Sequence, residues 1–130
     1  MSNVRIEADN ESFIIAETQN GQEGLYNNGT SENAIELEVV ISGGWPTTTS
    51  PKIQLKAKNK FVTLHGDTVV LDAAGAIENR DFEVVWRGVD AVALKGANGK
   101  FVSRETNESN KLRANRSEIG PWETFRLLTI

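Results

Sequence analysis

Apolar and polar residues alternate through most of the chain, in short runs that are separated by turns rich in Asn and Gly. The clearest run, residues 92–103, alternates up to an Asn-Gly turn and then continues with a Phe-Val pair. Alternation with a period of two places one face of a strand on a core, and glycine tolerates the positive φ of a tight turn. The pattern therefore predicts a β-hairpin, followed by further strands near Leu112 and at 125–128.

The same pattern occurs three times along the chain. Residues 4–14 match 92–102 without a gap, and residues 53–62 match with one residue deleted in the turn. The later apolar positions match in two sets, which are Leu25, Leu71 and Leu112, and then Leu37, Phe82 and Phe125. Self-similarity at a period of about forty residues indicates a repeat architecture. The units divide at approximately 1–43, 52–88 and 89–130, with an insertion loop at 42–51.

Three all-strand units with one apolar face each favour a closed arrangement, because an open stack would expose strand edges. Three four-stranded units that close around a pseudo-threefold axis form an all-β fold, the β-trefoil, in which hairpins cap a barrel. A two-sheet sandwich is the alternative, but it gives no reason for repetition in thirds. The expected core contains Phe13, Phe61, Phe101, Leu37, Phe82 and Phe125, with Trp86 in the core or as a barrel cap.

The third unit carries three motifs, LKGANGKFV at 94–102, LRANR at 112–116 and GPWETF at 120–125. Together they resemble the repeat signature of fascin-like β-trefoil domains in the actin-crosslinking-like superfamily. The second unit departs from it, with Asp-Phe-Glu at 81–83 in place of the Trp-Glu-Thr-Phe box. The resemblance implies that this box is structural in the third unit, with Glu123 bonded to the preceding turn.

The same resemblance implies a binding function, because the family includes actin-bundling fascins and domains attached to secreted carbohydrate-active enzymes. A carbohydrate or glycan is therefore the first expected partner, and a protein such as actin is the alternative. A row of lysines at positions 52, 56, 58 and 60 bears on that alternative. Such a row suits an acidic partner, but it also keeps an exposed strand edge soluble.

Composition excludes several other functions. The chain has 130 residues, which suits one domain, and its formal net charge of −4 lacks the basic footprint that nucleic-acid binding needs. The absence of cysteine excludes disulfides and thiol catalysis, and a single histidine excludes a multi-histidine metal site. No segment is apolar enough to span a membrane, and no cofactor is expected.

The sequence contains no recognisable catalytic motif. It shows no glycine-rich phosphate loop, no nucleophile elbow and no histidine pair. None of its 18 acidic residues has the apolar setting expected of a catalytic acid. We therefore expect a binding module and no enzyme.

The first residues carry neither the basic nor the apolar region of a secretory signal peptide. This pattern favours a cytoplasmic protein. A secreted protein whose signal peptide is not part of this sequence would look the same, so both localisations stay open.

Polar turns of a trefoil unit offer the groups that bind sugars, because amides and carboxylates bond to hydroxyls and an aromatic ring covers the apolar face. The candidates are Tyr26, Asn27 and Asn28 in the first unit, His65 and Asp67 in the second, and Arg113 and Asn115 in the third. Trp45 in the insertion loop is a further candidate, although its ring is equally suited to plug the barrel end. The same residue types are also common in ordinary turns.

Overall fold

The computed structural model describes residues 3–19, 21–43, 51–57, 59–73, 77–88, 91–105 and 111–129. Its twelve strands form one continuous sheet and fall into three successive units of four. The first unit contains β1 (Asn3–Ala8), β2 (Phe13–Gln19), β3 (Gln22–Gly29) and β4 (Leu37–Gly43). The second contains β5 (Lys52–Ala57), β6 (Lys60–His65), β7 (Thr68–Asp72), the 3-10 helix η1 (Ile77–Asn79) and β8 (Phe82–Trp86). The third contains β9 (Ala91–Lys95), β10 (Phe101–Arg104), β11 (Leu112–Arg116), the 3-10 helix η2 (Pro121–Glu123) and β12 (Phe125–Thr129).

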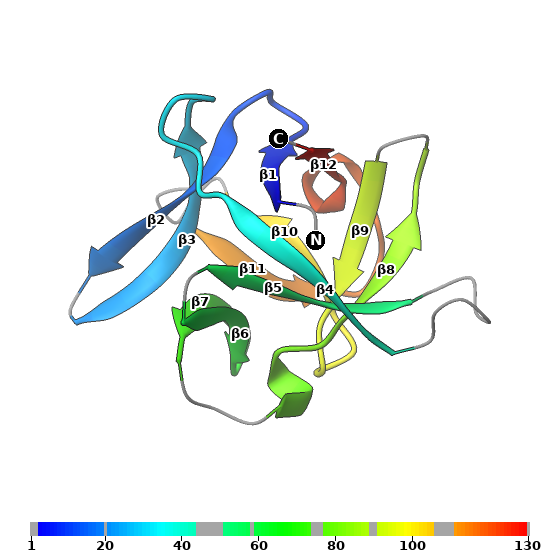
Figure 1. The fold of residues 1–130 in the computed structure, drawn as a ribbon. Coiled ribbons are helices and arrows are strands. Elements are labelled where there is room, and N and C mark those ends of the chain that lie inside the picture. Colours follow the sequence, from blue (N-terminus) through cyan, green and yellow to red (C-terminus); the bar gives the residue numbers. More distant parts are fainter. Residues whose placement is uncertain are drawn as a thin grey trace.

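The first and fourth strands of the three units close into a six-stranded barrel. Between units, β4 pairs with β5, β8 with β9 and β12 with β1, each through four or five residue pairs. Within units, β1 pairs more briefly with β4, β5 with β8 and β9 with β12. The ring is complete because β1 and β12, from opposite ends of the chain, lie side by side (Figure 1).

The two middle strands of each unit form a hairpin that caps the barrel, namely β2–β3, β6–β7 and β10–β11. Each hairpin also meets both of the others. The contacts are Gly24 with Val70, Thr68 with Arg113, and Tyr26 with Lys111. This barrel with a threefold cap is a β-trefoil, and it confirms the fold expected from the repeated strand pattern.

One hydrophobic core collects apolar side chains from all three units. Leu37, Phe82 and Phe125 occupy equivalent positions at the start of β4, β8 and β12, and each is at most 1% exposed. Their matched spacing in the sequence therefore identified a matched layer of the core. Burying each of these side chains is worth roughly 1.5–3 kcal/mol.

The expectation that Phe13, Phe61 and Phe101 join this core is wrong, because all three are only half-buried. The core residue is the next one along each strand, Ile14, Val62 or Val102. Successive side chains of a strand point to opposite faces, so the two neighbours cannot both point inward.

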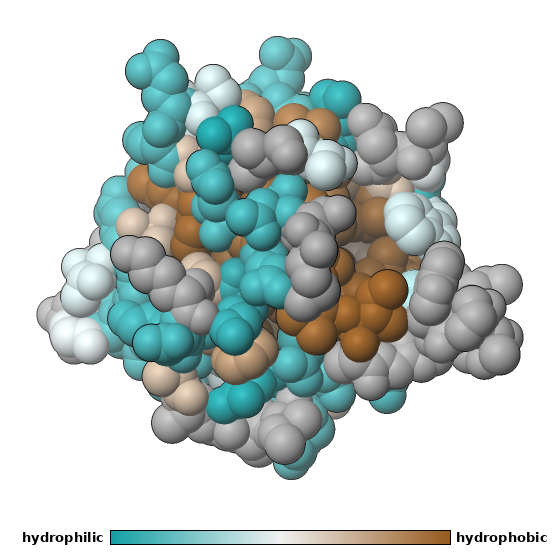
Figure 2. Space-filling model, viewed as in Figure 1, coloured by the Kyte–Doolittle hydropathy of each residue, from teal (hydrophilic) through white to brown (hydrophobic). Residues whose placement is uncertain are grey.

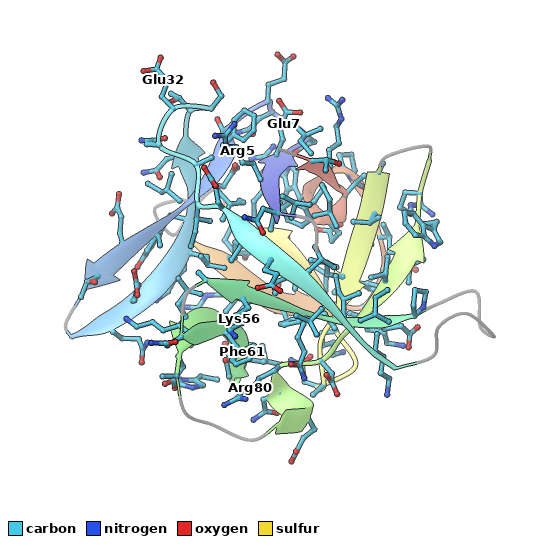
Figure 3. All side chains as sticks on the ribbon, viewed as in Figure 1. Arg5, Glu7, Glu32, Lys56, Phe61 and Arg80 are labelled. Carbon is cyan, nitrogen blue, oxygen red and sulfur yellow. The ribbon has the colours of Figure 1, made fainter. Side chains whose placement is uncertain are left out.

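Phe61 instead lies between the core and two cationic side chains. The Nζ atom of Lys56 is 5.7 Å from the centre of its ring, and the Cζ atom of Arg80 is 4.4 Å away (Figure 3). Phe101 has a similar partner in Lys95, at 5.9 Å. A cation over an aromatic face is attracted by the ring quadrupole, which suits a phenylalanine at the margin of the protein.

The pairing register also corrects the match of the third strands. Leu71 pairs with the core valine of β6 as Ala114 pairs with the core valine of β10. Val69, and not Leu71, is therefore the equivalent of Leu112. The match made from the sequence was therefore shifted by two residues. Because side chains alternate with a period of two, this shift still places apolar residues on the same face of the strand.

Trp86 is 56% exposed, so the expectation that it joins the core or caps the barrel is wrong. It shares a strand face with Phe82 and Val84, but it lies at the end of β8, past the buried part of that strand. Ile41 lies near the end of β4 and is 53% exposed, and Figure 2 shows apolar side chains gathered near this end of β4. Alternation determines which face of a strand a residue occupies, but it does not determine how deeply that residue is buried.

Candidate functional site

Two of the candidates in the first unit are buried. Tyr26 is 3% exposed and Asn27 is 1% exposed, and the amide Nδ2 of Asn27 donates to Asn10 Oδ1 at 3.4 Å. Burial raises the pKa of the Tyr26 phenol, and the nearby Glu17 carboxylate raises it further. A ring that stacks on a sugar needs a face in solvent, which the placement of Tyr26 does not provide. Asn28 is exposed, whereas Trp45 lies outside the described residues.

The candidates in the second unit have protein partners. His65 Nε2 lies 2.9 Å from Asp72 Oδ2. Asp67 Oδ1 accepts a hydrogen bond of 2.9 Å from Arg113, which also donates to Thr68 Oγ1 at 3.0 Å. The structure thus brings Asp67 and Arg113 together, in an ion pair that links the hairpins of the second and third units.

Asn115 belongs to a different cluster. Its side chain is exposed, and its Nδ2 atom lies 3.5 Å from Glu105 Oε1. Glu105 is buried, and its two oxygens accept from one terminal nitrogen of Arg116 at 3.3 and 3.0 Å. These three residues form a continuous polar network beside η2.

Trp122 of η2 completes this cluster. Its ring is 39% exposed, and the Cζ atoms of Arg104 and Arg116 lie 5.7 and 5.6 Å from the ring centre. A hollow of about 410 Å³ adjoins the ring and is lined by residues 116–123. We call Trp122, Arg104, Arg116, Glu105 and Asn115 the Trp122 platform.

Local sequence explains why η2 holds its tryptophan in a defined position. Pro121 suits the first turn of a helix, since it has no backbone N–H to leave unpaired. The buried Glu123 carboxylate accepts a 2.6 Å hydrogen bond from the Gly120 N–H, and Thr124 Oγ1 donates to the Gly120 carbonyl at 2.9 Å. The expected bond from Glu123 to the preceding turn is therefore present.

Each arginine of the Trp122 platform faces a carboxylate. Arg104 donates from both Nε and a terminal nitrogen to the carboxylate of Asp9, the latter bond measuring 3.1 Å. Arg116 is paired with Glu105 through one terminal nitrogen, which lies 3.0 Å from Oε2. Because positive and negative charges are matched, the platform favours a neutral polar ligand over an anion.

Sequence reasoning missed Arg104 and Glu105 and gave Trp122 only a structural role. One signal was available, since two charged residues directly follow the apolar start of the strand at 101–103. The partners of this pair come from residues 9 and 116, which alternation alone could not connect.

A second hollow, of about 640 Å³, lies between the first and second units; we call it the inter-unit groove. It combines apolar and polar side chains. Lys60 of β6 reaches Glu23 of β3 across the boundary between the units, with Nζ and Oε1 2.7 Å apart. The lining residues are Ala16, Glu23, Asn33, Ile35, Glu36, Ala57, Asn59, Lys60 and Leu71.

The lysine row expected to suit an acidic partner is partly occupied by these contacts. Lys60 pairs with Glu23, and Lys56 lies over the ring of Phe61. Lys58 lies outside the described residues. An acidic partner would therefore have to displace Glu23 to reach Lys60.

The part of the chain that the structure describes forms neither a metal-ligand cluster nor a membrane-spanning helix. That part of the chain places no three His, Cys, Asp or Glu side chains where they could hold a metal ion together. Its helices include none that is both long and apolar enough to cross a membrane.

Comparison with known proteins identifies the fold. The designed threefold-symmetric protein ThreeFoil superposes with a TM-score of 0.74 at 15% identity, covering 98% of this chain and 99% of that one. SeviL, solved with asialo-GM1 saccharide, gives 0.72 at 11% identity over 98% and 97% of the two chains. The BEL β-trefoil gives 0.71 at 12% identity over 99% and 93%. No protein-family model and no curated protein matches the sequence. Likeness at these identities shows the β-trefoil fold alone.

Proposed function

We propose that this domain is a non-catalytic carbohydrate-binding module and that Trp122 lies at the centre of its binding surface. The observation that carries the proposal is a half-exposed indole ring that adjoins a polar network of matched charge. A sugar has an apolar face, polar hydroxyls and no net charge, so its surface is complementary to this combination.

The expected contacts follow from the chemistry of a pyranose ring. Its C–H face is apolar and packs on the exposed part of the Trp122 ring. Its hydroxyls need directional partners, which the Asn115 amide and the Arg116 guanidinium supply at the edge of the platform. The Glu105 carboxylate holds both of these side chains and thereby fixes the spacing of the donors.

The platform is also preorganised. Glu123 fixes the turn that carries Trp122, and Asp9 fixes Arg104 against the same ring. Groups that are already ordered lose less conformational entropy when a ligand binds, so more of the contact energy becomes affinity.

Two further observations support a glycan as the partner. The fold is similar to that of SeviL, which was solved with a saccharide. The motifs at 94–102 and 120–125 resemble fascin-like domains, some of which accompany carbohydrate-active enzymes. These observations support the class of ligand, whereas the position of the site rests on the Trp122 platform.

The proposal is tested on a glycan array with labelled protein and with two tryptophan variants. Trp122→Ala removes the stacking surface, so we expect affinity to fall by about tenfold or more, equivalent to about 1.4 kcal/mol. Trp86→Ala is the matched control, because Trp86 is at least as exposed but lies on β8 and does not line the hollow beside Trp122. We expect the control to bind every glycan that the original protein binds.

Other results would redirect the proposal. Equal loss in both tryptophan variants would remove Trp122 as the specific centre. Loss confined to Asn28→Ala or Trp45→Ala would move the site to the first unit or to the insertion loop. If the original protein binds no glycan on the array, a protein-interaction module of fascin type becomes the favoured alternative. Cosedimentation with actin filaments would then be the next measurement.

A further inference from the structure

The inter-unit groove owes its shape to one small side chain. Ala16 of β2, Leu64 of β6 and Arg104 of β10 occupy equivalent positions, since each pairs with the equivalent residue of the third strand in its unit. Each lies at the boundary between its own unit and the next. The three boundaries therefore differ at this position, where the chain has alanine, leucine and arginine.

At the other two boundaries the larger side chain fills the space. Leu64 leans over Gly96, and its Cδ2 atom lies 3.0 Å from the point that a Cβ on that glycine would occupy. The hollow at that boundary is smaller, about 340 Å³, and its lining includes Lys52, Glu83 and Lys95 but not Leu64. At the third boundary Arg104 takes the position and binds Asp9.

At the boundary between the first and second units, Ala16 leaves the apolar floor open. This floor, the apolar lining of the groove, consists of Ala16, Ile35, Ala57 and Leu71. Ala16 and Ala57 also pack against the core, so the floor belongs to the rigid part of the molecule. The two alanine methyl groups and the larger side chains of Ile35 and Leu71 together offer an apolar surface on which a small apolar ligand group, such as a methyl, can pack.

The rim of the groove is polar but electrically balanced. Lys60 is paired with Glu23 at 2.7 Å, and Glu36 is paired with Arg5 at 3.3 Å. The charged rim residues Glu23, Glu36 and Lys60 are therefore all in ion pairs. A charged ligand would have to break one of these pairs. The rim therefore favours a neutral ligand.

Two carboxamides on the rim supply directional hydrogen bonds. Asn33 Oδ1 accepts from the Thr30 N–H at 2.6 Å, which orients the side chain and leaves its Nδ2 group as the donor for a ligand. Asn59 is exposed at the same rim and offers both a donor and an acceptor. A ligand that suits this groove therefore combines one methyl-sized apolar group with several neutral polar groups.

We propose that the inter-unit groove binds an N-acetylhexosamine unit. The acetamido methyl lies on the floor over Ala16 and Leu71, and the amide and the ring hydroxyls bond to Asn33, Asn59 and the Glu23–Lys60 pair. A plain hexose has the hydroxyls but lacks the methyl that fills the floor. The proposal rests on the proposed function for the class of ligand, but it uses residues separate from the Trp122 platform.

The test is a heteronuclear NMR titration of the full chain with free N-acetylglucosamine, N-acetylgalactosamine and glucose. We expect saturable shifts of the backbone amides of Ala16, Ala57 and Leu71 with the two acetylated sugars. Glucose should bind about tenfold more weakly or not at all, because it leaves the apolar floor exposed to water. Equal binding of glucose, or shifts confined to the η2 turn, would overturn the proposal.

Two variants test the groove directly. Ala16→Leu places in the first unit the side chain that Leu64 provides in the second, and it should abolish the shifts by filling the floor. Asn59→Ala removes an exposed rim amide and should weaken binding about tenfold. Asn3→Ala is the matched control, since Asn3 is also exposed but lies on β1 outside the groove. Unchanged binding in both Ala16→Leu and Asn59→Ala would overturn the proposal, and the Asn59 variant decides the question if Ala16→Leu does not fold.

Trp122→Ala separates this proposal from the function proposed above. We expect this variant to bind N-acetylglucosamine in the groove with unchanged affinity. Array binding that depends on Trp122, combined with no shifts in the groove, would refute the second site and leave the proposed function standing. If the groove amides shift and Trp122→Ala leaves array binding unchanged, the groove site stands and the Trp122 platform is refuted as the binding surface.

Discussion

At the scale of single residues, the exposure of each aromatic side chain decides what it can do. From the sequence, Tyr26 is a candidate for sugar binding, whereas Trp122 belongs to a box that is expected to be structural. The structure buries Tyr26 in β3, whereas η2 leaves Trp122 half-exposed. A ring needs a face in solvent to contact a ligand, so of these two residues only Trp122 can present one.

The buried Tyr26 predicts a specific loss of stability at alkaline pH. Its pKa is raised above 10.0 in the folded protein, first by burial and then by Glu17. Its contribution to stability is fully present below the unfolded pKa and is lost as the pH rises through the folded pKa. Because the chain has a single tyrosine, tyrosinate absorbance reports this group directly. We expect ionisation at a higher pH in the native protein than in the urea-unfolded protein.

Tyr26→Phe supplies the comparison for that titration. The variant cannot ionise at this position, so its free energy of unfolding should decline less between pH 9 and pH 12, a window placed around the ordinary tyrosine pKa of about 10. Identical alkaline profiles for the two proteins would mean that Tyr26 does not govern the loss. Coincident native and unfolded ionisation of Tyr26 would contradict the effect of burial itself.

At the scale of elements, the η2 turn shows how a local motif can position an exposed tryptophan. Gly120, Pro121, Glu123 and Thr124 each have a backbone or side-chain role in the turn, and Trp122 is the residue left facing outward. The same four positions explain why the box resembles a structural signature. A structural motif and the tryptophan that we propose to bind sugar thus occupy one segment without conflict.

Removal of the Glu123 carboxylate should destabilise this turn. In Glu123→Ala the part-buried Gly120 N–H loses its charged acceptor, which should lower the free energy of unfolding by about 1–3 kcal/mol. Urea denaturation measures the change. Glu118→Ala is the control, because Glu118 is exposed in the same segment and should shift stability by no more than about 0.5 kcal/mol. Equal effects of the two substitutions would show that the carboxylate bond contributes nothing specific.

At the scale of the whole molecule, closure explains both stability and the differences among the three units. The barrel closes through β1 and β12, and the cap closes through contacts among all three hairpins. Closure leaves the barrel without free edges, and it places the equivalent residues Leu37, Phe82 and Phe125 in one layer. The three units are therefore alike in the core, whereas at the boundaries between units the equivalents of Ala16 are different residues.

Two phenylalanine substitutions should separate core from margin. Phe82→Ala creates a cavity in the shared core and should cost about 3–5 kcal/mol. Phe61→Ala removes a half-buried ring and its contacts with Lys56 and Arg80, which should cost clearly less, about 1–2 kcal/mol. Chemical denaturation of both variants tests the difference. A larger loss for Phe61→Ala would contradict the assignment of the core.

The sequence by itself determined the strands, their repetition in thirds and the closed all-β fold. These features follow from alternation and from turn residues. Both are local signals, and both occur in each of the three units. The matched core positions Leu37, Phe82 and Phe125 were found for the same reason, since the spacing from each hairpin to its closing strand is nearly constant.

Only the tertiary structure decided how deep each residue lies and which distant residues meet. Alternation could not show that Phe61 stops at the margin, that Trp86 lies past the end of the core, or that Tyr26 is buried. The Trp122 platform joins residues of the third unit to Asp9 of the first, a contact that exists because the barrel closes. The inter-unit groove became visible only when the pairing register aligned Ala16 with larger side chains, because depth and adjacency depend on the assembled sheet rather than on the local pattern.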